Sequence, residues 1–355
     1  MKKNLAIILV CLPSILFAQD ISLYVGTYTD STSNGIYHYN FNSKTGEISN
    51  QQLAAKTKNP SFLTFSSNKK YLFSVNEVDN YDNTNNGFVS SFLVKKNGTL
   101  QLLNEINSNG AHPCHISLNK EGTKAAISNY SGGTISIHEI GKTGINQANQ
   151  IINHNVSVKK SHAHSSHFFN NELFVADLGL DYLAHYKNNG HKYLLNTNYS
   201  MTNKAGPRHF EITENGNFIY VINELNSTIT VLKKKNEAFN KVQNISTLDT
   251  KFKGENFCAD IHLSKDENYL YGSNRGENTI VVFKINKSNG LLKKIQTIST
   301  YGNWPRNFTL SPTGNFLLVA NQKSRNISVY SLNQDNGKLT FFHSKNTPTP
   351  VCLLF

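Results

Sequence analysis

Cysteine is scarce in this sequence, and long apolar segments are missing after the first residues. The chain has 355 residues and four cysteines. Cys11 lies in the N-terminal apolar stretch, and the others are Cys114, Cys258 and Cys352. Three cysteines leave at least one thiol unpaired even in an oxidising compartment. We expect all three to be small buried apolar residues.

Other absences narrow the fold and the chemistry. No segment has the sustained apolar periodicity of an amphipathic helix. No Pro/Ser-rich hinge, low-complexity tract or long charged run divides the chain into domains. A GxSxG nucleophile motif is missing, which argues against a serine hydrolase. An acidic calcium-binding loop is also missing, and we expect neither a metal nor a cofactor.

Positive charge is in clear excess. The formal net charge is +12 and the pI is about 9.3. The lysines are scattered, and no basic stripe with interleaved aromatic residues is present, so we expect no nucleic-acid partner. A solvated basic surface is one interpretation of the charge, and attraction of small anions is the other.

The first eighteen residues are predicted to be a signal peptide. Two lysines precede an apolar run from Leu5 to Phe17, and Ala18 is the small residue expected at a cleavage site. The run is too short for a transmembrane helix, so no membrane span is expected. We predict a periplasmic or secreted protein in which residues 19–355 form one domain.

One segment type recurs along the chain at a period of roughly 50 residues. Four copies open with a proline, and two keep the frame without it. The copies are PSFLTFSSNKKYLFSVNE from Pro60, PCHISLNKEGTKAAISNY from Pro113, HAHSSHFFNNELFVADL from His162, PRHFEITENGNFIYVINE from Pro207, CADIHLSKDENYLYGSNR from Cys258 and PRNFTLSPTGNFLLVANQ from Pro305.

A seventh copy is divided between the two ends of the chain. PVCLLF, at Pro350 to Phe355, matches the opening of a unit, and LYVGTY, at Leu23 to Tyr28, matches its continuation. A circular repeat closed by pairing the chain ends is how a β-propeller hides its sheet edges. A frayed C-terminal tail is the alternative.

Each unit reads as four short strands. The first two flank a polar turn such as TENGN, a third follows as in NTIVVFKI, and a fourth comes after a turn such as KSNG. Alternating β-branched and aromatic residues suit antiparallel pairing. We therefore predict an all-β fold, a seven-bladed β-propeller of four-stranded blades closed by the N- and C-terminal strands.

Aligning the units gathers polar residues at one end of every blade, because the first strand of a hairpin starts beside the end of the second. The two positions after the opening residue hold Ser61-Phe62, Cys114-His115, Ala163-His164, Arg208-His209, Ala259-Asp260, Arg306-Asn307 and Val351-Cys352. The position after the second strand holds Tyr28, Glu77, Tyr130, Leu178, Glu224, Arg275 and Gln322. These positions predict a polar ring around the axis, and blade folding alone does not require its arginines and histidines.

Two local patterns refine this ring. Arg208 and His209 are adjacent, so strand alternation predicts opposite faces, with Arg208 toward the axis and His209 between blades. His162 and His164 share a strand face and form a candidate zinc pair. No carboxylate or cysteine in the same stretch completes a metal site, so none is expected there.

At these residues the chain resembles the seven-bladed β-propeller lactonase family, which includes 6-phosphogluconolactonases of the cycloisomerase-2 type and the fungal carboxy-muconate lactonizing enzyme. The resemblance covers essentially all of the chain after the signal peptide. The motifs that carry it are YVGTYT (Tyr24–Thr29), HPCHIS (His112–Ser117), AHSSHF, VADLGLD, GPRHF (Gly206–Phe210), SNRG (Ser273–Gly276), WPRNF (Trp304–Phe308) and PVCLLF.

The resemblance implies a site of one histidine, two arginines and one glutamate. These fall on His164, Arg208, Glu224 and Arg275, all within the ring, although Ala163 stands where the family has proline. The family's activity implies hydrolysis of a sugar lactone, with the arginines binding an anionic substrate and stabilising the oxyanion. Either His164 or Glu224 would take the proton from water.

Other polar residues of the ring are expected to contact the substrate. We expect four more side chains to bind substrate: Glu77, His115, His209 and Arg306. The partner would be a small anionic sugar lactone or related acid, and the protein a monomer or weak dimer. The alternative is a non-catalytic exported propeller that binds a sugar acid, a glycan or a protein, because fold alone does not fix function.

Overall fold

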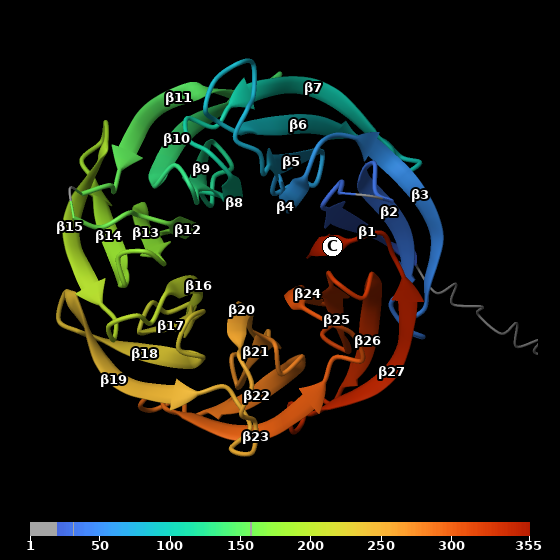
Figure 1. Ribbon diagram of the computed structural model, residues 1–355, viewed down its shortest axis with the longest axis vertical. Helices are drawn as coiled ribbons and strands as arrows, with labels where there is room; N and C mark the ends of the chain where they lie inside the picture. Colours follow the sequence, from blue (N-terminus) through green and yellow to red (C-terminus); the bar gives the residue numbers. More distant parts are fainter. Residues whose placement is uncertain (1–19, 31, 157) are drawn as a thin grey trace, which may run out of the picture.

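Seven four-stranded antiparallel sheets stand around one axis (Figure 1). The computed structural model describes residues 20–30, 32–156 and 158–355. The predicted signal peptide, residues 1–18, lies outside the described residues. Within the described ranges, no helix is long and apolar enough to span a bilayer. The predicted all-β propeller of seven blades is confirmed.

Every blade runs outward from the axis in four steps. The inner strands are β28 (Pro350–Leu354), β4 (Pro60–Phe65), β8 (Pro113–Leu118), β12 (Ala163–Phe169), β16 (Pro207–Ile212), β20 (Phe257–Leu263) and β24 (Pro305–Leu310). The second strands are β1 (Asp20–Thr27), β5 (Tyr71–Asn76), β9 (Lys124–Asn129), β13 (Glu172–Asp177), β17 (Phe218–Asn223), β21 (Tyr269–Arg275) and β25 (Phe316–Asn321).

The two outer layers complete the sheets. The third strands are β2 (Gly35–Asn42), β6 (Phe88–Val94), β10 (Thr134–Gly141), β14 (Tyr182–Asn188), β18 (Thr228–Lys235), β22 (Thr279–Ile285) and β26 (Asn326–Leu332). The outermost strands are β3 (Ile48–Lys56), β7 (Leu100–Asn107), β11 (Gly144–Asn153), β15 (Tyr193–Ser200), β19 (Ala238–Ser246), β23 (Leu292–Ser299) and β27 (Leu339–Asn346).

The core lies between neighbouring blades. Residues on the two middle strands are buried on both faces because each blade packs against the next one, as Tyr220 and Val231 do against Leu270 and Phe283. The outermost strands alternate exposed and partly buried residues, since one face meets solvent. The apolar alternation in the sequence thus becomes seven interblade layers.

The closing blade joins both ends of the chain. β28 pairs antiparallel with β1, with Val25 opposite Leu353, and the sheet continues through β2 and β3. Leu353 also packs with Leu318 and Val329 of the preceding blade. The divided seventh unit is therefore a complete blade.

The three described cysteines are buried and form no disulfide, as expected. Each lies near the start of an inner strand. Burial raises the pKa of the Cys258 thiol and of the Cys352 thiol to about 12. At neutral pH these thiols are therefore protonated and unreactive.

Candidate active site

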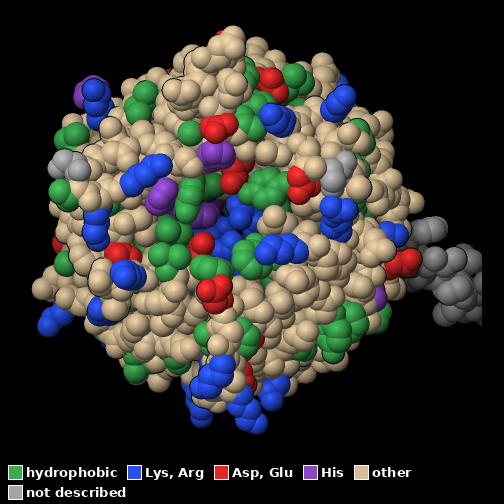
Figure 2. Space-filling model, in the orientation of Figure 1, with side chains coloured by type: hydrophobic (Ala, Val, Ile, Leu, Met, Phe, Trp, Pro, Cys, Tyr) green, Lys and Arg blue, Asp and Glu red, His purple; other side chains and the backbone are tan. Residues whose placement is uncertain are grey.

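The molecule is hollowed at its axis, and Lys and Arg side chains lie at the floor of the hollow (Figure 2). The starts of the inner strands and the ends of the second strands meet here, because each blade repeats the same antiparallel hairpin. Only four arginines occur in the whole chain. Three of them, Arg208, Arg275 and Arg306, belong to this ring.

A register shift near the start of every inner strand decides which side chains face the hollow. In β16, Pro207 pairs with Asn223 and His209 pairs with Ile222, so Arg208 is an extra residue on the bulged strand. The same shift occurs in the other six blades. A bulge re-aims side chains and breaks simple alternation.

The predicted opposite orientation of Arg208 and His209 is therefore wrong. Nη1 of Arg208 lies 3.3 Å from Nε2 of His209, so both side chains meet below the hollow. His209 also contacts rings from other blades at the axis. Period-two alternation missed this, because it allows no extra residue at the blade opening.

The predicted frame of the β12 unit is one residue early. Ala163 pairs with Asp177 and thus holds the position that proline holds in most other units. His164 therefore corresponds to Arg208, and not to His209. The signal available in the sequence was the shorter turn of this unit, which has two residues fewer than the other units when it is counted from Ala163.

Two arginines converge on Glu224. Nε of Arg208 lies 2.9 Å from Oε2 of Glu224, and Nη2 of Arg275 lies 2.7 Å from the same oxygen. The arginine side chains are 2% and 6% exposed and that of Glu224 is 16% exposed. The carboxylate therefore forms the solvent-facing part of the group.

Electrostatics keep all three groups charged. Burial by itself raises the pKa of the Glu224 carboxyl, but the charges of Arg275 and Arg208 outweigh it, and the pKa lies below its ordinary value of 4.5. Burial lowers the pKa of Arg275 to about 10, which still leaves the guanidinium protonated at neutral pH. The cluster therefore carries one excess positive charge.

A second charged group lies on the same ring. Oε2 of Glu77 accepts a 2.8 Å hydrogen bond from the hydroxyl of Tyr28 and lies 3.5 Å from Nη2 of Arg306. The Arg306 guanidinium stacks 5.2 Å from the Tyr28 ring centroid. Arg306 thus reaches from the β24 blade past the closing blade to the β4 blade.

Aromatic and histidine rings fill the axis next to these charges. The centroid of His115 lies 4.4 Å from that of Phe62 and 5.6 Å from that of His209. His164 lies 5.1 Å from His209. These rings come from β4, β8, β12 and β16, so side chains from opposite sides of the propeller meet.

Burial keeps the histidines neutral. It is the largest cause that holds the pKa of His115 and the pKa of His164 well below 6.5, and nearby histidines and arginines lower both further. Nδ1 of His164 is buried without a hydrogen-bond partner among the described residues. The neutral imidazole therefore keeps one nitrogen without a protein partner in the described part of the chain.

The histidine pair proposed as a zinc site is not arranged as one. Nδ1 of His162 lies 3.0 Å from the backbone oxygen of Tyr130, and its ring stacks on the Tyr130 ring. In the described part of the chain, no group of three His, Cys, Asp or Glu side chains is arranged to hold a metal ion.

The sequence placed Tyr28, Tyr130 and Asp260 in the ring, but it predicted no function for these three residues. Tyr28 binds Glu77, and Tyr130 packs edge-to-face on His164 at 5.6 Å. Asp260 binds His209. The sequence signal for Asp260 was an acid at the unit position that holds Phe, His or Asn in neighbouring blades.

One cleft lies away from the ring. It has a volume of about 560 Å³ and is formed by the distal turns of two adjacent blades, with Leu263, Tyr269, Leu310 and Leu332 in its walls. Leu263 and Leu310 end β20 and β24, Tyr269 begins β21 and Leu332 ends β26, all at the end of the blades away from the charged ring. The cleft is separate from the arginines and histidines.

The family follows from comparison of the whole chain. The family model of a lactonase with a seven-bladed β-propeller matches residues 22–355. The chain belongs to this lactonase family. The predicted family is thus confirmed.

Individual lactonase relatives span nearly the same length. A 6-phosphogluconolactonase of Formosa agariphila is 37% identical over 314 residues, which are 82% of this chain and 86% of that protein. A 6-phosphogluconolactonase of Bacillus subtilis is 30% identical, covering 94% and 97%. The solved structure of the Pseudomonas aeruginosa periplasmic gluconolactonase is 28% identical with a TM-score of 0.88, covering 95% and 99%.

Proposed function

We propose that this protein hydrolyses a sugar lactone to its acid in the axial hollow. The observation that carries the proposal is the convergence of Arg208 and Arg275 on one oxygen of Glu224 at 2.9 and 2.7 Å. Fixed guanidinium groups suit a carbonyl oxygen that becomes negative as water adds. The family, and the lactonase names of the relatives above, support the reaction class.

The chemistry needs one proton acceptor and one oxyanion site. Water adds to the lactone carbonyl carbon and loses a proton to the base, and the carbonyl oxygen becomes an oxyanion beside the arginines. The intermediate then collapses, the bond from the carbonyl carbon to the ring oxygen breaks, and the ring oxygen takes the proton back from the base. The product is a hydroxy acid, which ionises in water.

We assign the base to Glu224. Its Oε2 is held by both arginines, whereas Oε1 has no hydrogen-bond partner among the described residues and can hold a water molecule. His164 is 4% exposed, and its burial-lowered pKa makes it a weaker acceptor. The neutral imidazole is better suited to contact a substrate hydroxyl.

We propose that the substrate is either an anion itself or a neutral lactone whose product is an anion. Arg208, Arg275 and Arg306 carry one positive charge more than Glu77 and Glu224, and the histidines His115 and His164 beside them are neutral. The negative charge of Asp260 is offset by His262, whose pKa is raised to about 10. A charged phosphate or the product carboxylate would complement this excess. Arg306 and Glu77 then lie on the rim as substrate contacts.

We propose export to the periplasm or beyond. The basic and apolar N-terminus has the pattern of a signal peptide. The relative from Pseudomonas aeruginosa is a periplasmic gluconolactonase. An exported enzyme would meet an unphosphorylated sugar lactone more readily than a cytosolic phosphorylated one.

The test is hydrolysis of a lactone panel by purified residues 19–355. Glucono-δ-lactone and 6-phosphogluconolactone are followed by proton release, with the spontaneous rate subtracted. Saturable hydrolysis of either one, lost in Glu224→Gln, supports the proposal. A wild-type protein that binds gluconate but hydrolyses no lactone would favour the non-catalytic binding propeller.

A further inference from the structure

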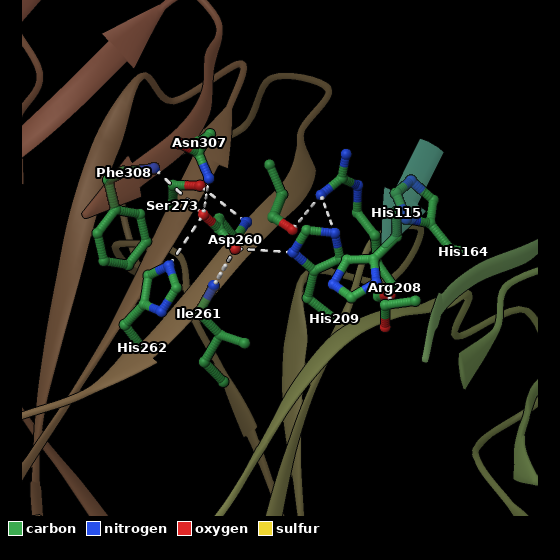
Figure 3. Close-up of polar contacts among 12 residues, drawn as sticks. His115, His164, Arg208, His209, Asp260, Ile261, His262, Ser273, Asn307 and Phe308 are labelled. Atoms are coloured by element: carbon green, nitrogen blue, oxygen red, sulfur yellow. Dashed lines mark hydrogen bonds and ion pairs between the residues drawn. The ribbon is translucent and has the colours of Figure 1, made fainter. Parts of the chain in front are cut away.

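One buried carboxylate beside the arginines has no part in the reaction above. Asp260 is 2% exposed and lies at the junction of three adjacent inner strands (Figure 3). Its five hydrogen-bond donors are Nδ1 of His209 at 2.7 Å, the backbone N of Ile261 at 3.0 Å, Nδ2 of Asn307 at 2.6 Å, the backbone N of Phe308 at 3.2 Å and Nε2 of His262 at 3.2 Å. Such a site holds an ionised carboxylate in one orientation.

The contacts on both sides of His209 fix its tautomer. Oδ1 of Asp260 lies 2.7 Å from Nδ1 and can only accept, so Nδ1 carries the proton. Nη1 of Arg208 lies 3.3 Å from Nε2 and can only donate, so Nε2 keeps its lone pair. The imidazole is therefore neutral, and its two nitrogens have different tasks.

His209 in turn supports one edge of the Arg208 guanidinium. Nη1 of Arg208 also donates to the backbone oxygen of Ala259 at 2.5 Å, and Nε faces Glu224. Nη2 has no hydrogen-bond partner in the described part of the chain. Nη1 is held by hydrogen bonds, and Nε is in an ion pair with Glu224 but makes no hydrogen bond to the described residues. Nη2 is then the group left for the substrate.

We propose that Asp260 is a positioning residue that orients Arg208 through His209. Asp260 accepts the Nδ1 proton of His209, which leaves Nε2 as an acceptor for Arg208 and fixes the guanidinium in the plane that presents Nη2 to the substrate. This inference rests on the proposed lactonase function for its kinetic consequence only. The histidine tautomer is a property of the resting protein.

Low basicity of His209 agrees with this arrangement. Burial and the charge of Arg208 lower the pKa of His209 to about 4, although Asp260 opposes them. A protonated His209 would place an N–H against the guanidinium. The neutral ring is therefore the form that supports Arg208 at neutral pH.

Two substitutions of His209 separate its two contacts. In His209→Gln the amide oxygen reaches the place of Nε2 and keeps the acceptor for Arg208. In His209→Asn the amide nitrogen takes the place of Nδ1 and keeps the donor for Asp260. We expect His209→Gln to retain at least tenfold more kcat/KM than His209→Asn, because about 1 Å of misplacement at a reacting group can cost about 100-fold.

Thermal stability should follow the opposite order. Asp260 loses a donor in His209→Gln and keeps it in His209→Asn, so the Asn variant should have the higher Tm. A purely structural role of His209 predicts the same order for Tm and kcat/KM. Equal activity of the two variants, or higher activity of His209→Asn, would overturn the proposal.

The tautomer is measured directly by ¹⁵N NMR of histidine-labelled wild-type protein. The His209 signal is assigned by its loss in His209→Gln, and we expect a protonated Nδ1 and an unprotonated Nε2. A protonated Nε2 would overturn the inference even if the enzyme is active. If no lactone is hydrolysed, the proposed function fails, while the tautomer and the gluconate affinities of the two variants still decide the positioning role.

A charge swap provides the matched rescue. In Asp260→Asn the new amide sets a donor against either Asn307 or His209, so the tautomer signature should be lost. Asp260→Asn with Asn307→Asp restores a donor–acceptor pair between these two positions and leaves Oδ1 of residue 260 to accept from His209, although the backbone N of Phe308 and Nε2 of His262 lose their acceptor. We expect the double variant to regain the tautomer and at least tenfold in kcat/KM over Asp260→Asn. A double variant that regains the tautomer without this gain in kcat/KM contradicts the proposal.

Discussion

The arginines of the hollow are rare residues placed where the fold can use them. Lysine supplies most of the positive charge of the chain, yet three of its four arginines lie on the axis. A planar guanidinium can hold a carboxylate with one edge and a substrate oxygen with another, which lysine cannot do. Substitutions at these positions should therefore affect chemistry more than folding.

Arg208→Ala and Arg275→Ala should each lower kcat on the best lactone by about 10²–10³, because each removes a charge-assisted donor to the oxyanion. Arg306→Ala should act mainly on KM, since Arg306 lies on the rim with Glu77. Arg325→Ala, outside the ring, is the matched control. Unchanged turnover in both Arg208→Ala and Arg275→Ala would place the site elsewhere.

The pH profile tests Glu224. Its carboxyl has a pKa below 4.5 in the folded protein, so the ionised base persists as pH falls through neutrality. We expect kcat/KM, corrected for spontaneous hydrolysis, to be constant from pH 8 down to about 5 and to fall only below about 4.5. A half-maximal point between pH 6 and 7 would indicate a histidine with an ordinary pKa instead.

Single substitutions distinguish the two candidate bases. Glu224→Gln keeps the shape of the side chain and loses the proton acceptor, so kcat should fall by about 10²–10⁴. His164→Gln keeps a polar contact and should change KM more than kcat. The reverse pattern would assign the base to His164.

At the scale of the strand, the sequence predicted pairing well and side-chain direction less well. Repeated prolines and polar turns located the hairpins, so alignment of the repeats was enough to group Arg208, Glu224 and Arg275 in one ring. The bulge at each blade opening was invisible, because its extra residue has no distinct residue type. His164 was assigned to the wrong unit position for a different reason, because Ala163 replaces the proline that marks the start of most units and the turn of this unit is shorter.

The closing strand gives the clearest test at this scale. Deleting residues 350–355 removes β28, which pairs with β1 and packs against the preceding blade. It also removes the backbone N of Leu353, which donates to Asn307 at 2.7 Å. We expect aggregation or a markedly lower Tm by calorimetry, because the inner edge of β1 becomes exposed. A truncated monomer with unchanged Tm would contradict this role for β28.

At the scale of the whole molecule, the sequence predicted the closed ring of seven blades but not the side-chain contacts across its axis. Seven blades were predicted from six complete units and one divided unit, because circular repeats must close. The meeting of Phe62 with His209 across the axis and the five contacts of Asp260 depend on how tightly the inner strands approach. Sequence spacing carries no information about that distance.

Export of the whole protein can be tested directly. Expression of the full-length chain in a Gram-negative host, followed by fractionation and N-terminal sequencing, should give a periplasmic product that begins at Gln19 or Asp20. Deletion of residues 2–18 is the control and should leave the protein in the cytoplasm. An intact Met1 on a cytoplasmic full-length product would overturn the predicted export and favour the phosphorylated lactone.

The pairing of β28 with β1 also makes closure of the ring a single event in folding. The two strands come from opposite ends of the described chain, so the blades form an open arc until these strands meet. A molecule truncated within the closing blade would keep exposed strand edges, which proteases can recognise. Circularity thus acts as a completeness check on each folded molecule.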